Sequence, residues 1–535
     1  MLMNAADYRE SLRRYHPRVF VNGRRVESVA DEPLLSPGIA GVGVTYDFAH
    51  RQEHQALMLA RQGTSGKIVN RMLHIDESST DLLYKLEAVR LVCQESGCAQ
   101  RYLAHDALNG ILQATKRCDD AHGSGYHQRF LAYLHRVQDE DLALGIAMTD
   151  AKGDRSKHPG EQENPDVYVH MKERRADGIV IRGTKAIVTG APYMHEFLVM
   201  PCRTMTKEDA AFAVCCAVPV DAPGVTIVAK PAGRPGEAAA KFSAKYGQSV
   251  GVVMFDDVFV PHERVFLDGE TEEGGTLTTS YATHHRHSCI GARAGFGDLL
   301  IGAGALMIEA NGLDPDRHGH IRDSMVDLIK IVEGFFACGV AASVYCMKDF
   351  SGSVMPDTVF ANVGKLLLST QIYDMHRLAH QVSGGLVVAL PGPDEDHNPE
   401  TAASLSAVLG GTRRRARRTT RRGCALHRGS YRVASGGLVF RDLAAWRRLA
   451  GSDEARNLAE LSGDGSRRAG RAIARPRCLG SRPARAETAG PLLRGRLRSA
   501  GTARRGGVVS FPTREARPGI QKVVEVAPRF PLSRE

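Results

Sequence analysis

The 535-residue chain lacks the features that define membrane-spanning, secreted and common nucleotide-binding proteins. It has no run of about 18 uncharged apolar residues, and the nearest candidate, residues 331–347, contains Glu333 and has the composition of a buried helix. The N-terminus has neither the apolar core nor the cleavage site of a secretion signal. Because GxGxxG and Walker motifs are absent, the sequence predicts no Rossmann or P-loop nucleotide site.

Disulfide-forming cysteine patterns are also missing. The 11 cysteines are scattered, with one adjacent pair, Cys215 and Cys216, and no CxxC spacing. This usage is typical of a reducing compartment rather than of a disulfide framework. We therefore expect a cytoplasmic protein without a membrane segment.

Excess basic charge is absent from most of the chain, although the whole carries a formal net charge of +10. Residues 412–535 hold 30 basic and 9 acidic side chains, a net charge of +21, whereas residues 1–411 hold 40 and 51, a net charge of −11. We therefore expect no nucleic-acid partner for the body. The tail has 29 Arg, one Lys and no apolar periodicity. It is either a disordered basic arm or an out-of-frame translation.

Hydrophobic periodicity divides the rest into three parts. Residues 1–143 predict a helical domain and residues 276–411 a second one, with long helices that are apolar on one side. Between them, residues 144–275 contain short β-branched segments bounded by turn residues, such as Gly178–Thr189 and residues 250–260. Segments of this kind predict an antiparallel barrel or sandwich. The order indicates an α+β, acyl-CoA-dehydrogenase-like fold with an N-terminal helical domain, a middle antiparallel β-barrel and a C-terminal helical bundle.

Two polar segments can carry chemistry. Residues 147–155 (AMTDAKGDR) place hydroxyl, carboxylate and cationic groups on a glycine-containing turn. Lys152 and Arg155 suit a pyrophosphate, and the backbone N–H groups suit a flavin edge, although a capped surface turn is the alternative. Residues 281–293 (YATHHRHSCIGAR) cluster three histidines that suit either metal or acid–base chemistry, or a hydrogen-bonded structural role: His284, His285 and His287.

Five segments taken together resemble one enzyme family. They are MLMNAADYRESLRRYHPRVFVNGRRVE at the start, AMTDAKGDR, DGIVIRGTKAIVTGA, FDDVFVPHERVFL and HRHSCIGARAGFGDLLIGA. They resemble the 4-hydroxybutanoyl-CoA dehydratase/vinylacetyl-CoA Δ-isomerase family. More distantly, they resemble the flavin-dependent 4-hydroxyphenylacetate 3-monooxygenases of the same superfamily. The match covers residues 1–411 and implies an acyl-CoA-dehydrogenase-like fold, a bound FAD and a homotetramer.

The resemblance implies that FAD is held by two segments, both intact here. The first is the turn, with Met148, Thr149, Asp150, Lys152 and Arg155. The second is a strand end, whose threonine lies near the isoalloxazine N5 in that family; it comprises Thr189, Gly190 and Ala191. We expect these eight residues to bind the cofactor.

The dehydratases of that family also carry a [4Fe–4S] cluster held by three cysteines and one histidine. Cys98 and His285 match two of these ligand positions, whereas Tyr102 and Ala292 stand at the other two. A cluster held by one thiolate and one imidazole is poorly retained. We therefore expect no intact cluster, with Cys98 and His285 as residual ligand positions.

The other active-site positions implied by the resemblance are mixed. Gln100 is kept, Arg293 stands where the family has a lysine, and Cys289 stands where it has a tyrosine. We predict a catalytic set of Gln100, Tyr102, Arg293 and His285. In this hypothesis His285, released from iron, titrates near neutral pH and acts as the base. Of the phenol-gripping residues of the monooxygenases only Tyr102 is present, so neither template assigns the substrate.

Three functions remain open at this stage. The first is an FAD enzyme that abstracts a proton from a short acyl-CoA next to the flavin. The second is a reduced-flavin-dependent monooxygenase that hydroxylates a phenol such as 4-hydroxyphenylacetate and uses a separate flavin reductase. The third is an inactive paralogue or a basic-tailed binding protein. Codons for residues 437–452, read one nucleotide later, permit AWFSETSQHGGGSPEA, similar to the family's glutamate-bearing segment, so we favour a frameshifted tail.

Overall fold

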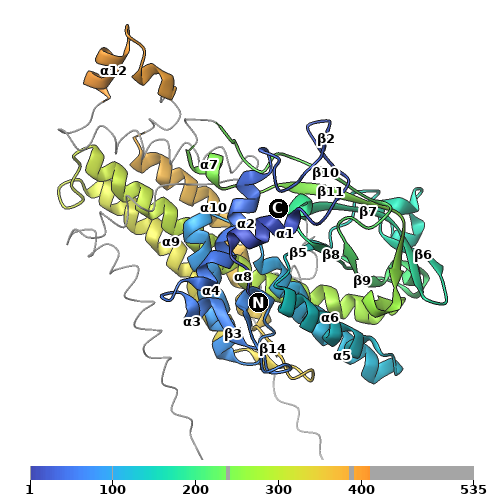
Figure 1. Cartoon of the computed structure of the whole chain (residues 1–535). Helices are drawn as coiled ribbons and strands as arrows, with labels where there is room; N and C mark the ends of the chain where they lie inside the picture. The colour runs from blue at the N-terminus through green and yellow to red at the C-terminus, as the bar shows by residue number, and fades with distance from the viewer. Residues whose placement is uncertain (1, 99, 237–240, 385–390, 410–535) are drawn as a thin grey trace, which may run out of the picture. The chain divides into compact units, whose positions relative to one another are not determined.

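The computed structural model describes residues 2–98, 100–236, 241–384 and 391–409, which all lie in one compact unit. The predictions made for residues 412–535 lie outside this part of the chain. Figure 1 shows long helices on one side of the described part and the strands on the other. The boundary between them follows the change from helical to alternating apolar spacing.

Helices dominate the N-terminal part. They are α1 (Ala5–Leu12), α2 (Ser36–His50), α3 (Gln55–Met58), α4 (Ser79–Ser96), α5 (Tyr102–His122) and α6 (Tyr126–Glu140). Asn4 is the N-cap of α1, because its side chain accepts hydrogen bonds from the backbone N–H groups of Ala6 and Asp7. Short hairpin strands also lie here: β1 (Val19–Val21), β2 (Arg24–Val26), β3 (Leu59–Arg61) and β4 (Ile68–Asn70).

The middle part forms two sheets. Its strands are β5 (Leu144–Ala147), β6 (His170–Arg174), β7 (Gly178–Thr189), β8 (Glu196–Val199), β9 (Val214–Pro219), β10 (Val225–Ala229), β11 (Val250–Pro261) and β12 (Val265–Asp268), with α7 (Lys241–Lys245) before β11. The first sheet has the order β2-β1-β10-β11-β7-β6, and the second has the order β12-β9-β8-β5. Phe197 of β8 and Phe255 of β11 face each other edge to face, at 6.4 Å between ring centroids. The two sheets therefore pack against each other through their apolar faces.

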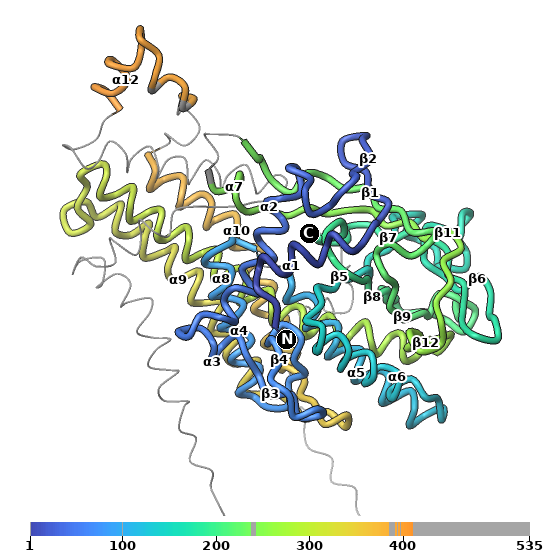
Figure 2. Tube along the Cα trace, in the orientation of Figure 1, coloured from blue at the N-terminus to red at the C-terminus, as the bar shows by residue number. Residues whose placement is uncertain are grey.

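The prediction of an antiparallel barrel is wrong. Within the described residues the strands form separate sheets rather than one closed barrel. Two neighbouring pairs are parallel, β1 with β10 and β5 with β8. Figure 2 shows the blue β1–β2 hairpin beside the green β10 and β11. Alternating apolar residues predict that one face of a strand is buried, but they do not specify strand direction or closure.

Long helices return after the sheets. They are α8 (Thr271–Ala310), α9 (Gly319–Val344) and α10 (Thr358–Val382), followed by α12 (Ala402–Val408) and accompanied by the hairpin β13 (Met347–Lys348) and β14 (Val354–Met355). Helix α8 packs against α4, α5, α9 and α10. Its backbone approaches α4 closely, because a Cβ at Gly295 would lie 2.3 Å from the Arg90 carbonyl oxygen. Glycine at this position therefore permits the contact that buries α8.

Among the described helices, α8 is long and apolar enough to cross a membrane by length and composition alone. This helix differs from residues 331–347, the segment that the sequence indicates as the nearest candidate. Its apolar window is 78% buried inside the protein. A core helix that contacts protein on nearly every side has the same composition.

Candidate functional site

The turn predicted to hold the flavin is fastened to β7 by a buried lysine. Lys185 Nζ donates hydrogen bonds to the carbonyl oxygens of Met148 and Met200, at 2.8 and 2.7 Å, and lies 2.6 Å from the Asp150 carboxylate. The Ala186 N–H donates to the Thr149 carbonyl at 2.8 Å. The backbone of the turn is therefore held in one position next to the strand.

The strand end that completes the predicted flavin site lies further along β7. Thr189 pairs with Val250 as the last residue of β7. Gly190 has φ +73°, and its N–H donates to the Ser249 carbonyl at 2.9 Å. A Cβ at Gly190 would lie 2.1 Å from Met194 Cε. Glycine here allows the left-handed turn that leads into Ala191, the first residue of a buried 3₁₀ turn.

The eight predicted flavin residues divide into two groups by exposure. Lys152 and Arg155 are exposed, and Thr149 and Thr189 are partly exposed, so cations and hydroxyl groups are accessible to a ligand. The other four, which are buried, are Met148, Asp150, Gly190 and Ala191. The Asp150 carboxylate is occupied by Lys185, the Val169 N–H and the Cys202 thiol. Asp150 therefore shapes the turn, and the accessible donors fit a flavin pyrophosphate and ring edge.

Gln100 links the strand end to the helical part. Its Oε1 accepts a hydrogen bond from the Tyr193 hydroxyl at 2.9 Å, and its Nε2 donates to the Gly247 carbonyl at 3.2 Å. The Tyr193 oxygen in turn accepts from the Ser249 N–H at 2.9 Å. Gln100 is almost completely buried, so these bonds fix it in place beneath Gly190.

His285 lies on α8 among the other predicted catalytic residues. Its Nδ1 is 3.2 Å from Asp106 Oδ2 on α5, and its Nε2 is 3.4 Å from Cys289 Sγ one helical turn later. The rings of Tyr281 and Tyr102 lie nearly parallel to the imidazole, with centroids 5.4 and 6.3 Å away. The structure therefore brings Tyr102 and His285 together.

The expectation that His285 titrates near neutral pH is wrong. Burial by itself lowers the pKa of the imidazole. The negative charge of Cys289 and the Asp106 carboxylate outweigh burial and raise the pKa to about 10. His285 is therefore mostly protonated at neutral pH, because the groups around it favour the imidazolium form.

Tyr102 ends the α4–α5 connection that also carries Cys98. Burial raises the pKa of the Tyr102 phenol well above its ordinary value, and the negative charges of Cys289 and Cys98 add to the effect, whereas Arg293 opposes it. Tyr102 is therefore a phenol at neutral pH. Three predicted site residues, Cys98, Tyr102 and Arg293, are thus coupled electrostatically, and the Tyr102 ring also lies beside His285.

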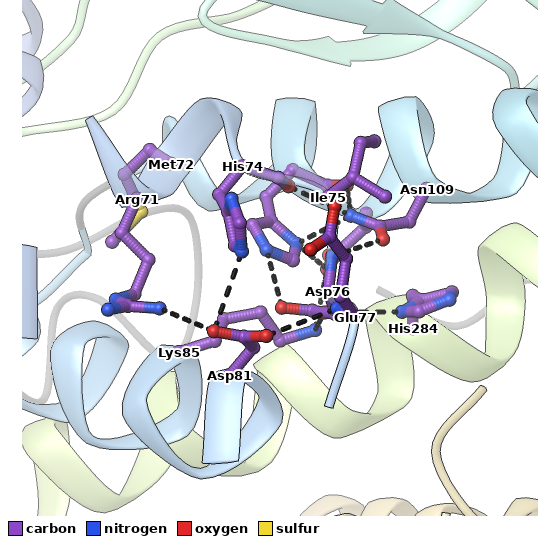
Figure 3. A network of polar contacts seen from close by, with 12 residues as sticks. Arg71, Met72, His74, Ile75, Asp76, Glu77, Asp81, Lys85, Asn109 and His284 are labelled. Carbon is purple, nitrogen blue, oxygen red and sulfur yellow. Dashed lines mark hydrogen bonds and ion pairs between the residues drawn. The ribbon is translucent and has the colours of Figure 1, made fainter. Parts of the chain in front are cut away.

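A buried polar network surrounds Asp76 and Lys85 (Figure 3), and Asp106 connects it to His285. Lys85 Nζ is 3.8 Å from Asp76 and 3.6 Å from Asp106, and His105 Nε2 is 3.2 Å from Asp76. Their side chains are fully excluded from solvent. Burial, reinforced by the Lys85 charge, lowers the pKa of His284 to about 3, so this histidine is neutral. Two carboxylates thus face two cations, Lys85 and His285, which balances the buried charge.

The three clustered histidines contact different partners and do not converge on one point. His287 Nε2 contacts the Ser343 hydroxyl at 2.7 Å and the Gly339 carbonyl at 3.2 Å on α9. His284 faces Asp76, and only His285 faces Cys289. Within the described ranges no group of three or more His, Cys, Asp or Glu side chains is arranged to hold a metal ion. Because Tyr102 and Ala292 supply no ligand for iron, the residues present do not fit a [4Fe–4S] cluster.

Sequence reasoning missed three charged residues that organise the site: Lys85, Asp106 and Lys185. Each interrupts an apolar pattern. Lys85 lies on the α4 face that carries Leu82, Leu86 and Val89. Lys185 continues the series of buried alternate positions that Ile179 and Ile181 begin on β7. A charge on a face that must be buried requires a partner, and this signal was present in the sequence.

Comparison with solved structures defines the class of the fold. The structure resembles an oxygen-tolerant archaeal 4-hydroxybutyryl-CoA dehydratase from N. maritimus, with TM-score 0.77 and 32% identity over 89% of this chain and 95% of that one. It also shares the fold of the oxygenase component of 4-hydroxyphenylacetate 3-monooxygenase complexed with FAD, with TM-score 0.70 and 20% identity over 88% and 98% of the two chains. The fold is therefore the mixed helix-and-sheet, acyl-CoA-dehydrogenase-like fold of these enzymes.

Sequence comparison then identifies the family. Residues 4–267 match the family described as 4-hydroxyphenylacetate 3-hydroxylase N terminal, and residues 275–421 match its C terminal counterpart. A 4-hydroxybutyryl-CoA dehydratase/vinylacetyl-CoA-Delta-isomerase from Clostridium aminobutyricum is 35% identical over 75% of this chain and 83% of its own. A 4-hydroxyphenylacetate 3-monooxygenase oxygenase component from Thermus thermophilus is 24% identical over 75% and 82%. The chain belongs to the 4-hydroxyphenylacetate 3-hydroxylase family, whose members similar to it are enzymes.

Proposed function

We propose that the chain is an FAD-dependent enzyme that moves a proton on a short acyl-CoA. The observation that carries the proposal is the 35% identity to a dehydratase/isomerase. The neighbouring rings of Tyr102 and His285, and the position of Gln100 against Gly190 at the end of β7, support it. Vinylacetyl-CoA isomerisation requires only relocation of a proton, so it does not depend on an iron–sulfur cluster. It is therefore the reaction that suits this set of residues.

The exposed and partly exposed residues of the turn and strand end are the ones that would hold FAD. Lys152 and Arg155 would contact the pyrophosphate, and Thr149 and Thr189 would hydrogen-bond the flavin edge. When bound, FAD supplies an acceptor for an electron or a hydride. The ion pair between Lys185 and Asp150 keeps the turn in position.

His285 is the base in this proposal, and its surroundings set its working range. With a pKa raised to about 10, only a small fraction is neutral at pH 7, but that fraction is strongly basic. It removes the α-proton of the thioester, while the Tyr102 phenol and Arg293 supply donors for the enolate oxygen. The isomerisation rate should therefore rise with pH until it approaches the pKa of His285.

The test is anaerobic conversion of vinylacetyl-CoA to crotonyl-CoA by the FAD-loaded chain. His285→Ala should lower the rate by about 100-fold or more with FAD retained. His320→Ala, which changes an exposed histidine of α9, is the matched control and should keep the wild-type rate. Equal rates for His285→Ala and the wild type would exclude the base role.

A monooxygenase is the second candidate, because Tyr102 is kept and a relative 24% identical is an oxygenase component. In this alternative the chain takes reduced FAD from a partner flavin reductase and hydroxylates a phenol such as 4-hydroxyphenylacetate. Oxygen consumption with reduced FAD and that phenol distinguishes the two functions. Absence of both activities in a folded, FAD-loaded protein would instead support an inactive paralogue.

We further propose that the chain is a cytoplasmic homotetramer. Large apolar side chains are exposed along α9, α10 and their connection: Val326, Val344, Tyr345, Val359, Val363, Leu366 and Tyr373. Because α9 and α10 pack against each other, these exposed apolar side chains would suit a protein–protein interface. Among the described cysteines none forms a disulfide, which suits a reducing compartment.

A further inference from the structure

A second reactive arrangement lies within the same helix pair. Cys289 Sγ is 3.4 Å from His285 Nε2, and His285 Nδ1 is 3.2 Å from Asp106 Oδ2. The Cys289 sulfur, the His285 imidazole and the Asp106 carboxylate therefore form a continuous line of contacts from α8 to α5. This is the order in which a carboxylate orients an imidazole that activates a nucleophile.

The carboxylate end of this line is rigidly held. Asp106 Oδ1 accepts a hydrogen bond from the Ser288 hydroxyl at 2.6 Å and lies 3.6 Å from Lys85 Nζ, which leaves Oδ2 for His285. The Asp106 side chain is fully buried. Because His285 Nδ1 is occupied by Asp106, Nε2 is directed at the sulfur of Cys289.

The sulfur is buried beside a partly exposed imidazole. Cys289 is 2% exposed, whereas 28% of the His285 side chain is exposed, so a substrate would reach the sulfur from the side of the imidazole. The Tyr102 ring lies nearly parallel to the imidazole, with 6.3 Å between the ring centroids. Its phenol O–H is suited to donate to an oxyanion formed at a carbonyl attacked by the sulfur.

Two other described cysteines, Cys202 and Cys338, have different partners. Cys202 hydrogen-bonds the Asp150 carboxylate, and the Cys338 thiol donates to the Gly334 carbonyl on its own helix. The resemblance described in the sequence analysis also distinguishes Cys289, because it implies a tyrosine at this position. The arrangement is thus a property of this chain's own residues rather than of the family's template.

We propose that Cys289 is a nucleophile that accepts an acyl group from a thioester, with His285 as its base and Asp106 as a positioning residue. His285 Nε2 already holds the thiol proton in the imidazolium–thiolate pair, and the thiolate sulfur attacks the carbonyl carbon. The carbon–sulfur bond of the donor breaks, and the proton on His285 passes to the leaving thiolate. The products are acyl-Cys289 and a free thiol, without oxidation or reduction.

The acyl group leaves by hydrolysis. A water molecule gives its proton to His285 and attacks the acyl-Cys289 carbonyl, which releases a carboxylic acid and restores the thiol. The net activity is that of a slow thioesterase. The choice of acyl-CoA as donor rests on the proposed function, whereas the nucleophilic character of Cys289 does not.

The experiment acylates the full chain with two separate probes, p-nitrophenyl acetate and vinylacetyl-CoA, and locates the adduct by peptide mass spectrometry. We expect an acyl group on Cys289 with both probes and none on Cys338. Cys289→Ala should abolish that adduct, and Asp106→Asn should slow its formation by about 100-fold. Cys338→Ser is the matched control and should acylate at the wild-type rate.

The outcomes separate the two proposals. Acylation by the ester but not by vinylacetyl-CoA would overturn the acyl-CoA donor, and lack of acylation by either probe would overturn the nucleophile. An adduct spread equally over Cys289, Cys338 and Cys346 would also overturn it. Crotonyl-CoA formation by the same preparation reports the proposed isomerase independently of any adduct. If circular dichroism shows that Asp106→Asn is unfolded, the wild-type peptide map together with Cys289→Ser decides.

Discussion

Lys185 Nζ and the Asp150 carboxylate lie 2.6 Å apart, with their side chains only 2% and 4% exposed. This pair connects β7, which ends at Thr189, with the turn that carries Lys152 and Arg155. The same ammonium group hydrogen-bonds two backbone carbonyls. A single buried cation therefore sets the relative position of both predicted flavin segments.

Lys185→Met should destabilise the protein strongly. Removing one partner leaves Asp150 as an uncompensated buried carboxylate, which costs about 3–5 kcal/mol in the free energy of unfolding. Urea denaturation followed by circular dichroism measures this loss. The matched control is Lys172→Met, which breaks an exposed ion pair with Asp257 and should leave the midpoint unchanged. Equal midpoints for the two variants would show that the buried pair does not hold the turn.

Arg155→Ala and Thr189→Val should each weaken FAD binding by about tenfold, which corresponds to one lost hydrogen bond. The measurement is titration of the apoprotein with FAD, followed by flavin fluorescence. Arg175→Ala, which removes an exposed arginine paired with Glu173, is the control and should bind FAD like the wild type. Unchanged affinity in both test variants, with wild-type thermal unfolding, would place the flavin elsewhere.

The protein should lose stability as the pH falls below about 6.5. Burial, with the charges of Arg101 and Arg14, lowers the pKa of His195 to about 3. Between pH 6.5 and 3 the unfolded chain therefore binds a proton that the folded chain does not, so stability rises with pH in this window. Each such proton contributes about 1.4 kcal/mol per pH unit.

His195→Gln tests this pH dependence. The variant loses the hydrogen bonds of His195 with the Ala143 N–H and Ser11, so it should be less stable at pH 7. Its free energy of unfolding should nevertheless fall less steeply with acidification than that of the wild type. His50→Gln, at an exposed histidine, should keep the wild-type slope. Parallel slopes for all three proteins, from urea denaturation at several pH values, would exclude His195 as the source.

Gly183→Ala should cost more than about 2 kcal/mol of stability. Gly183 has φ +126°, and a Cβ there would lie 2.1 Å from the Tyr168 carbonyl oxygen. Gly66→Ala is the matched control, with φ +67° and open space around the added Cβ, and should cost only about 1–2 kcal/mol. Thermal unfolding of both variants measures the difference, and similar melting temperatures would show that the backbone near Tyr168 relaxes.

Local patterns predicted many elements well. The strand expected at Gly178–Thr189 is β7, and the long helices expected within residues 276–411 include α10 (Thr358–Val382). Capping chemistry and apolar spacing act within a few residues, so they are readable from the sequence. Apolar spacing does not determine every strand boundary, because Pro165 begins a 3₁₀ turn and β6 starts only at His170.

Strand direction, sheet closure and the chemistry of His285 depended on residues distant in the chain. Cys289 and His285 are four residues apart on one helix, so their contact follows from helical geometry. Asp106, which lies 179 positions before His285, reaches it only because α5 packs on α8. The sequence therefore determined the donors present and their local spacing. The tertiary structure decided the His285 pKa, because burial and partner charges from other elements set which protonation state is stable.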